Sequence, residues 1–239
     1  MTAWTLLLRS LRFHWRAHLG VLLGATLSTA ILVGALAVGD SVRHSLRGMA
    51  LSRLGNIHLA LHGGSRFFRT ELAGEVSGEL QAPVAPAILL RGTASAGGGE
   101  ARAARVQIVG VSEPFWAVGG GRPLLREDEE SVVLNERLAG ALGVKVGDEV
   151  VLRADKPSLL SRDAPLSTVE DTTVALRLPV AAIARDAEFG RFSLESNQLP
   201  PFNAFVPLKV LQGKIDLPDR ANTLLVGAGT GKSVAPAEA

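Results

Sequence analysis

The feature that most constrains this chain is an apolar segment near its N-terminus. Residues Leu19 to Gly39 form a run of 21 residues without a charged side chain. A helix of that length, rising about 1.5 Å per residue, matches the roughly 30 Å hydrocarbon core of a bilayer. The segment therefore predicts a transmembrane helix over residues 19–39.

The charges on either side of this segment predict its orientation. Arg9, Arg12 and Arg16 precede it without any acidic residue, and Asp40 follows it at once. Basic residues favour the cytoplasmic side, so we expect the N-terminus in the cytoplasm and the rest of the chain on the other side of the membrane. Residues 1–18 are expected to form an amphipathic helix in the lipid headgroup layer, because Trp and Leu side chains share a face away from the three arginines: Trp4, Leu7, Leu8, Leu11 and Trp15.

Small residues recur along the apolar segment at four-residue spacing. Gly20, Gly24 and Ser28 form one series, and Ala30 and Gly34 form another. Such spacing lets a second helix approach closely, so Gly20, Gly24, Ala30 and Gly34 are expected to face neighbouring helices. A cleaved signal sequence is an alternative, with a cleavage site at Ala35-Leu36-Ala37, but the apolar run is longer than the roughly 7–15 residues typical of a signal.

Composition excludes several classes of protein. The chain has no cysteine, which rules out disulfide scaffolds, thiol nucleophiles and cysteine-ligated metal sites. Beyond residue 39 the 22 basic and 23 acidic residues nearly balance, so the excess basicity is confined to the N-terminus. A nucleic-acid-binding domain would instead carry a basic face, and we expect no nucleic-acid partner.

The part outside the membrane is predicted to be a strand-rich α+β domain. The helix is expected to continue over residues 40–56, stopping near Gly55, and to be followed by a domain over residues 57–239. Asn135 is the expected N-cap of a short helix that ends at Gly143. Glycine runs at 97–99 and 119–121 and the polar stretch 157–165 predict loops. Strands are predicted at 57–61, 105–111, 131–134, 149–153, 204–206 and 223–226, and at 174–183 as an edge strand or two short ones because of Pro179.

Three spans of the chain resemble ABC transporter permeases of the FtsX and MacB type. They are GVLLGATLSTAILVGALAVGDSVRHSL, VVLNERLAGALGVKVGDEVVL and LPVAAIARDAEFGRFSL. The second span, from Val132 to Leu152, matches a strand–helix–strand unit of the MacB-like periplasmic core domain. In that family a first transmembrane helix leads into a periplasmic domain, and further transmembrane helices follow.

The resemblance implies a transport function without an enzymatic site. A permease subunit of this type couples ATP hydrolysis by a partner ATPase to export of a periplasmic substrate or to mechanical signalling. It implies an ABC ATPase, a second permease copy and an accessory periplasmic protein as partners, and no cofactor, metal or catalytic residue. Because no second membrane segment precedes Ala239, we expect an N-terminal portion with an incomplete domain. The alternatives are a membrane-anchored adaptor or binding domain without an ATPase and, less favoured, an anchored hydrolase.

Four other motifs resemble functional sites only in part, and a group of aromatic residues has two interpretations. Gly227 to Ser233 resembles a P-loop but has three residues, not four, between its first glycine and the Gly-Lys pair. Ser41, in Gly39-Asp40-Ser41, matches the start of a serine esterase, but the chain has no Asp-x-x-His motif and its last histidine is His62, far from the C-terminus where those enzymes carry it. His14 and His18 lack a third metal ligand, and the acidic run 127–130 is expected to be a solvated loop. Phe189, Phe192 and Phe202 fit either an exposed recognition patch or the core.

Overall fold

The computed structural model describes residues 3–156, 173–195 and 199–228. The chain divides into two compact units, residues 1–49 and 50–239, each considered by itself. The first unit contains helix α1 (Ala3–Phe13) and most of helix α2 (Trp15–Leu54), which are separated by His14. The amphipathic helix expected over residues 1–18 is therefore divided at His14, and Trp15 belongs to α2.

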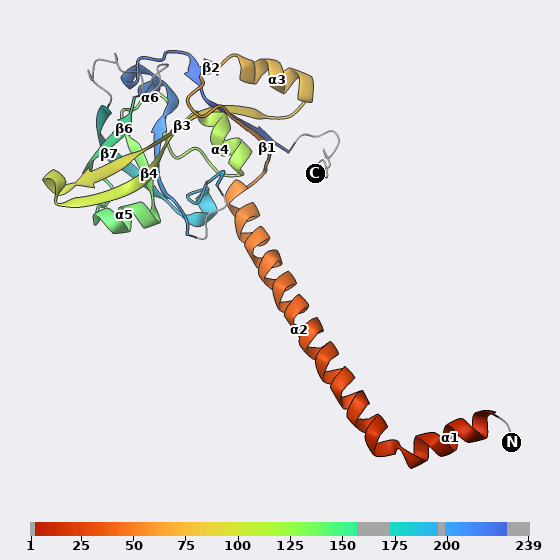
Figure 1. Ribbon diagram of the computed structural model, residues 1–239. Helices are drawn as coiled ribbons and strands as arrows, with labels where there is room; N and C mark the ends of the chain where they lie inside the picture. The colour runs from red at the N-terminus through yellow and green to blue at the C-terminus, as the bar shows by residue number, and fades with distance from the viewer. Residues whose placement is uncertain (1–2, 157–172, 196–198, 229–239) are drawn as a thin grey trace, which may run out of the picture. The chain divides into compact units, whose positions relative to one another are not determined.

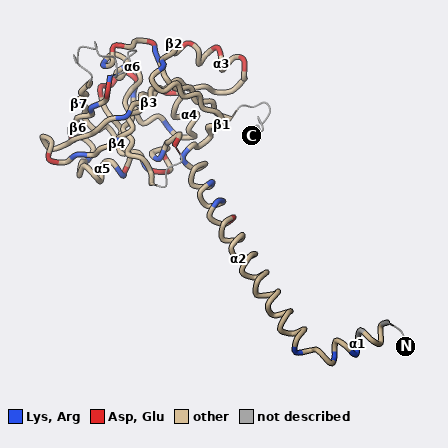
Figure 2. Tube along the Cα trace, viewed as in Figure 1, with Lys and Arg blue, Asp and Glu red and all other residues tan. Residues whose placement is uncertain are grey.

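Helix α2 is one helix of 40 residues that contains the whole apolar segment. It is long and apolar enough to cross a membrane, with a mean hydropathy of 2.2 over its most apolar window. Figure 2 shows the uncharged part of α2 as a continuous tan stretch, which begins after Arg16 in the first turn of the helix. The helix expected beyond residue 39 is the last part of α2, which ends at Leu54, and Gly55 then adopts a φ of +55°.

The second unit is built on a mixed sheet that closes on itself (Figure 1). Six strands pair in the ring β3-β4-β8-β5-β7-β6, and β6 returns to pair with β3. The first residues of β3 also pair with β10, which in turn pairs with β1 at the open edge. The strands are β1 (Ile57–His62), β3 (Val84–Ala96), β4 (Ala101–Val111), β5 (Val132–Asn135), β6 (Glu149–Asp155), β7 (Thr173–Ala184), β8 (Phe202–Pro207) and β10 (Thr223–Gly227).

Short elements cover the faces of this sheet. They are the helices α3 (Leu72–Leu80), α4 (Glu113–Gly119), α5 (Glu136–Leu142) and α6 (Leu208–Lys214), and the two-stranded pair β2 (Phe68–Arg69) and β9 (Arg220–Ala221). Buried side chains of α5 and α6, including Leu138 and Leu211, pack into the largest hydrophobic cluster. Those of α4 pack into a second, aromatic cluster, and α3 covers a small third one. The expected strand-rich α+β class is confirmed.

Pro179 has a different role from the one its sequence context predicts. Strand β7 is a single strand of 12 residues inside the ring, not an edge strand. Its first half pairs with β6 as far as Pro179, and its second half pairs with β5 from Val180 onwards. Proline lacks a backbone N–H, and here it lies where the strand changes partners, so little of the hydrogen-bond ladder is lost.

Candidate functional site

The first candidate site is the face of α2 that carries small residues. Gly20, Gly24, Ala30 and Gly34 are all exposed in α2. At about 100° per residue they lie within roughly 120° of the helix circumference. A Cβ atom built on any of the three glycines would meet no atom within 4 Å. The described chain itself therefore does not require glycine at these positions, and the face is open to a second helix.

The N-terminal arginines are exposed on the same unit. Arg9 and Arg12 lie in α1, and Arg16 lies in the first turn of α2. The Arg16 guanidinium is 5.6 Å from the centroid of the Trp15 ring, within the range of a cation–π contact. Exposed arginines beside exposed tryptophans are suited to the boundary between lipid headgroups and water.

The second candidate site is the junction at which α2 enters the folded domain. Arg53 is buried and Leu54 packs against the aromatic cluster. Gly55 follows with a φ of +55°, and a Cβ atom there would lie 2.4 Å from the carbonyl oxygen of Gly119. The next residue, Asn56, accepts a hydrogen bond from the Ala228 backbone N–H at 3.1 Å. The last turn of α2 is thus fixed to the domain through consecutive residues.

Aromatic side chains form the core behind this junction. Phe115 of α4 lies at the centre of this aromatic cluster. Its ring centroid is 5.2–5.9 Å from those of four other rings, in edge-on or tilted pairs: Trp116, Phe189, Phe192 and Phe205. Phe189 and Phe192 also contact each other, with centroids 5.1 Å apart. Phe189 and Phe192 are buried, so they are part of the core and not an exposed recognition patch. Phe202 is half-buried beneath the guanidinium of Arg137, at 4.6 Å from its ring centroid.

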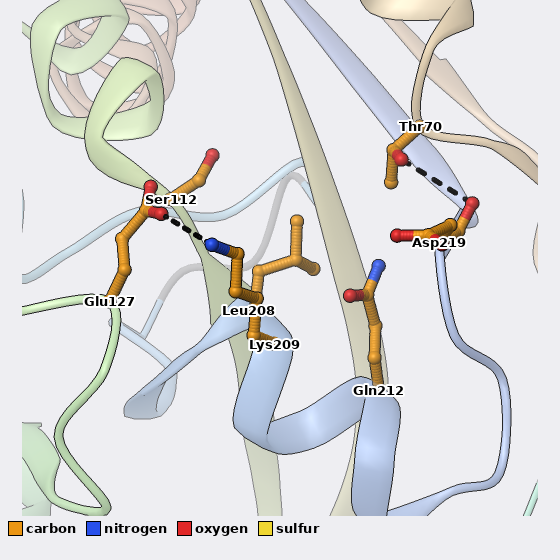
Figure 3. Close-up of a pocket in the computed structure, with 7 residues that line it drawn as sticks. All are labelled: Thr70, Ser112, Glu127, Leu208, Lys209, Gln212 and Asp219. Carbon is orange, nitrogen blue, oxygen red and sulfur yellow. Dashed lines mark hydrogen bonds and ion pairs between the residues drawn. The ribbon is translucent and has the colours of Figure 1, made fainter.

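The third candidate site is a hollow of about 180 Å³ on the second unit (Figure 3). Residues from several parts of the chain line this hollow. They are Thr70, Ser112, Glu127, Asp219 and three residues of α6, namely Leu208, Lys209 and Gln212. Glu127 and Lys209 form an ion pair at 3.5 Å across part of its rim. The lining combines carboxylates, an ammonium group, hydroxyls and an amide with an apolar floor at Leu208, which is suited to a small polar ligand.

The acidic run 127–130 is exposed, as expected, but three of its carboxylates are paired, that of Asp128 with the neighbouring Arg126 at 3.9 Å and two with lysines of α6. Glu127 contacts Lys209, and Glu130 lies 3.9 Å from Lys214. The Glu127 carboxylate also accepts the backbone N–H of Glu113 at 3.3 Å. These contacts hold the loop against α6 at the edge of the hollow.

The other motifs that the sequence singled out do not gather into a site. Ser41 lies inside the continuous helix α2, not on the turn that an esterase nucleophile occupies. His14 separates α1 from α2, and across the described ranges no group of three or more His, Asp or Glu side chains is placed to hold a metal ion. The P-loop-like stretch starts at the end of β10, and beyond Ala228 it lies outside the described residues, as does the polar stretch 157–165.

Several important residues carried no recognisable signal in the sequence. Gly119 packs against Phe189 and Asp219 bonds to Thr70, both far away in the chain, so the roles of these two residues become visible only in the folded domain. Gln212 bonds to the nearby Arg220 carbonyl but lines the hollow together with distant segments. Asn135 was the exception: its side chain accepts the Leu138 N–H at 3.0 Å and caps α5, as predicted. It also donates to the carbonyls of Gly190 and Pro201, and so ties two loops to the helix start.

Comparison with known proteins adds a family to this geometry. A model of the MacB-like periplasmic core domain matches residues 19–239. The periplasmic region of MacB from Actinobacillus actinomycetemcomitans has 16% sequence identity and a TM-score of 0.48, covering 77% of this chain and 80% of its own. The extracellular domain of the noncanonic ABC-type transporter YknZ from Gram-positive bacteria has 12% identity and a TM-score of 0.42, covering 72% and 85% respectively. No curated protein sequence matches the chain.

Proposed function

The chain belongs to the MacB-like periplasmic core domain family of ABC-type transporters, and on that premise we propose that it acts in a permease subunit that couples a partner ATPase to work outside the membrane. The observation that carries this proposal is the extent of the family match. A single family match runs from residue 19 to residue 239, and it therefore includes both the apolar part of α2 and the folded domain.

The proposed mechanism is mechanical. The family supplies a permease component and not an enzyme, so the chemistry of ATP hydrolysis belongs to a separate ATPase on the cytoplasmic side. Movement of the membrane helices would reach the exported domain through α2, because α2 continues without a break from Trp15 to Leu54. The contacts of Leu54 and Gly55 support this role, since Leu54 packs against the aromatic cluster and Gly55 lies close to the Gly119 carbonyl, so the last turn of α2 belongs to the folded domain.

The proposed contact surface within the membrane is the face formed by Gly20, Gly24, Ala30 and Gly34. The charge pattern beyond the apolar segment supports it. Val42 and Leu46 lie within about 40° of Gly24 around α2, whereas Asp40 and Arg47 lie about 140–160° away from it. Val42 is 51% exposed and Leu46 43% exposed. An apolar stripe that continues past the bilayer is expected if a neighbouring helix of the assembly runs beside α2.

Substitution within this face tests the proposal. Gly24→Leu should block the close approach of a second helix without changing membrane insertion. When a tagged copy of this variant is purified from membranes, the ATPase and a second subunit should no longer be recovered with it. Thr29→Leu is the matched control, because Thr29 lies about 140° away around the helix. Its hydroxyl donates to the Ala25 carbonyl of the same helix.

The outcomes separate the proposal from its alternative. Loss of partners with Gly24→Leu and normal recovery with Thr29→Leu is the expected result. Normal recovery of the ATPase with both variants would contradict the assigned contact face. Purification of the unsubstituted chain without any ATPase would contradict the permease function and favour a membrane-anchored adaptor.

A further inference from the structure

The hollow beside α6 has a floor that presents one unused acceptor. Leu208 and Gln212 are the buried members of its lining, 7% and 5% exposed. The Gln212 amide nitrogen donates to the Arg220 carbonyl at 2.8 Å, which fixes the orientation of the amide. In the part of the chain that the structure describes, no donor pairs with the Gln212 Oε1 atom. This oxygen therefore faces the hollow as an acceptor.

The rim of the hollow carries an uncompensated negative charge. Of its two carboxylates, Glu127 is paired with Lys209, whereas Asp219 has no cationic partner among residues 3–156, 173–195 and 199–228. The backbone of Asp219 is held in place, since its carbonyl accepts the Thr70 N–H at 2.9 Å and its φ is +54°. Figure 3 shows Thr70 and Asp219 on one side, Ser112, Glu127 and Lys209 on the other, and Leu208 and Gln212 between them.

A further polar atom in the wall lacks a partner. The Ser112 Oγ atom is buried and makes no hydrogen bond with any of the residues that the structure describes. A buried hydroxyl without a partner is unfavourable by about 1–3 kcal/mol in general, so such atoms in native proteins usually mark a place that a ligand or water fills. The hollow is several times the roughly 30 Å³ that one water molecule occupies in the liquid.

From these observations we propose that the hollow binds a cationic amine, that is, an ammonium or guanidinium group on an aliphatic stem. The cation pairs with the Asp219 carboxylate and donates to Gln212 Oε1, and the stem lies on Leu208. An anion is disfavoured, because Glu127 already occupies the single lysine of the lining. The amine is supplied either by a free polyamine or by the Lys or Arg side chain of a protein that docks here. This site does not depend on the permease function or on α2.

Nuclear magnetic resonance on the full chain in nonionic detergent, with ¹⁵N-labelled glutamine, tests the site. The probes are spermidine, acetyl-lysine methylamide and, as a stem without charge, acetyl-norleucine methylamide. The Gln212 side-chain signal, assigned from its loss in Gln212→Asn, should shift saturably with an amine probe and not with the norleucine probe. Asp219→Asn should weaken binding about tenfold or more, because a charge-assisted hydrogen bond is lost.

Asp216→Asn is the control, since Asp216 lies in the same loop and pairs with Lys156 outside the hollow. It should leave amine binding unchanged. Saturation by spermidine alone identifies a free polyamine, saturation by the lysine probe identifies a basic side chain, and either supports the site. No shift with either amine, or equal shifts with the norleucine probe, would overturn it. The comparison of the amine probes with the norleucine probe is made on the unsubstituted chain, so it still tests the site if Asp219→Asn fails to fold.

Discussion

Single glycine residues determine how the end of α2 meets the domain. Gly55 combines a left-handed backbone with a close approach to the Gly119 carbonyl, and Gly119 itself packs against the Phe189 ring. Each requirement alone favours glycine, because other L-residues are disfavoured in the left-handed region and a Cβ atom has no room there. The sequence predicts the first requirement, since a glycine after a helix commonly ends it. The second depends on a residue 64 positions later and carries no local signal.

Gly55→Ala should therefore destabilise the domain strongly. We expect the free energy of unfolding to fall by about 3 kcal/mol, from left-handed strain and from the clash with the Gly119 carbonyl. Gly64→Ala is the matched control, because Gly64 has a φ of +61° and open space around its Cβ position; it should cost about 1 kcal/mol. Chemical denaturation of both variants measures the difference. Equal losses would show that the close contact at the junction contributes nothing.

At the scale of elements, the sequence predicts strands better than it predicts helices or pairing. Strands such as β4 and β5 are apolar runs bounded by turn residues, and they form close to the expected positions. The sequence does not predict strand β3, because Pro86 and Gly92 interrupt its apolar pattern. In the fold, β3 pairs with three other strands. The helices α3, α4 and α6 were also missed, since elements of 7–9 residues show little periodicity. In α4, Pro114 just after Ser112 was a usable helix-start signal.

Closure of the strand ring depends on Gly92 of β3. A Cβ atom there would lie 2.1 Å from the Arg153 carbonyl on β6 and 2.9 Å from Ile108 Cδ1. Gly92→Ala should force β3 and β6 apart, so backbone amides of β6 should exchange with deuterium faster, while those of the β1–β10 pair keep their protection. Gly140→Ala in α5 meets no atom within 4 Å and should leave exchange in β6 unchanged or slower. Unchanged exchange in β6 of Gly92→Ala would contradict this role.

At the scale of the whole molecule, charge is distributed unevenly along the chain. Every charged residue before Asp40 is an arginine, whereas acidic and basic residues are nearly balanced beyond it. The three arginines are exposed and unopposed by any acidic residue in their own segment. One physical consequence is orientation, because short basic segments are retained on the cytoplasmic side during membrane insertion. The exported position proposed for the domain rests on this asymmetry together with the family.

Labelling of single cysteines can test this orientation directly, since the natural chain has none. Ser65→Cys, on an exposed loop of the domain, should react with a membrane-impermeant maleimide in intact spheroplasts, whereas Ser10→Cys in α1 should react only after lysis.

Replacing Arg9, Arg12 and Arg16 together by Gln should make Ser10→Cys reactive in part of the population, because the charge bias is removed. Arg43→Gln with Arg47→Gln removes charge from the other end of the apolar segment and should leave the pattern intact. If Ser10→Cys reacted in intact spheroplasts and Ser65→Cys did not, the N-terminus would lie outside, and a cytoplasmic ATPase could not reach it.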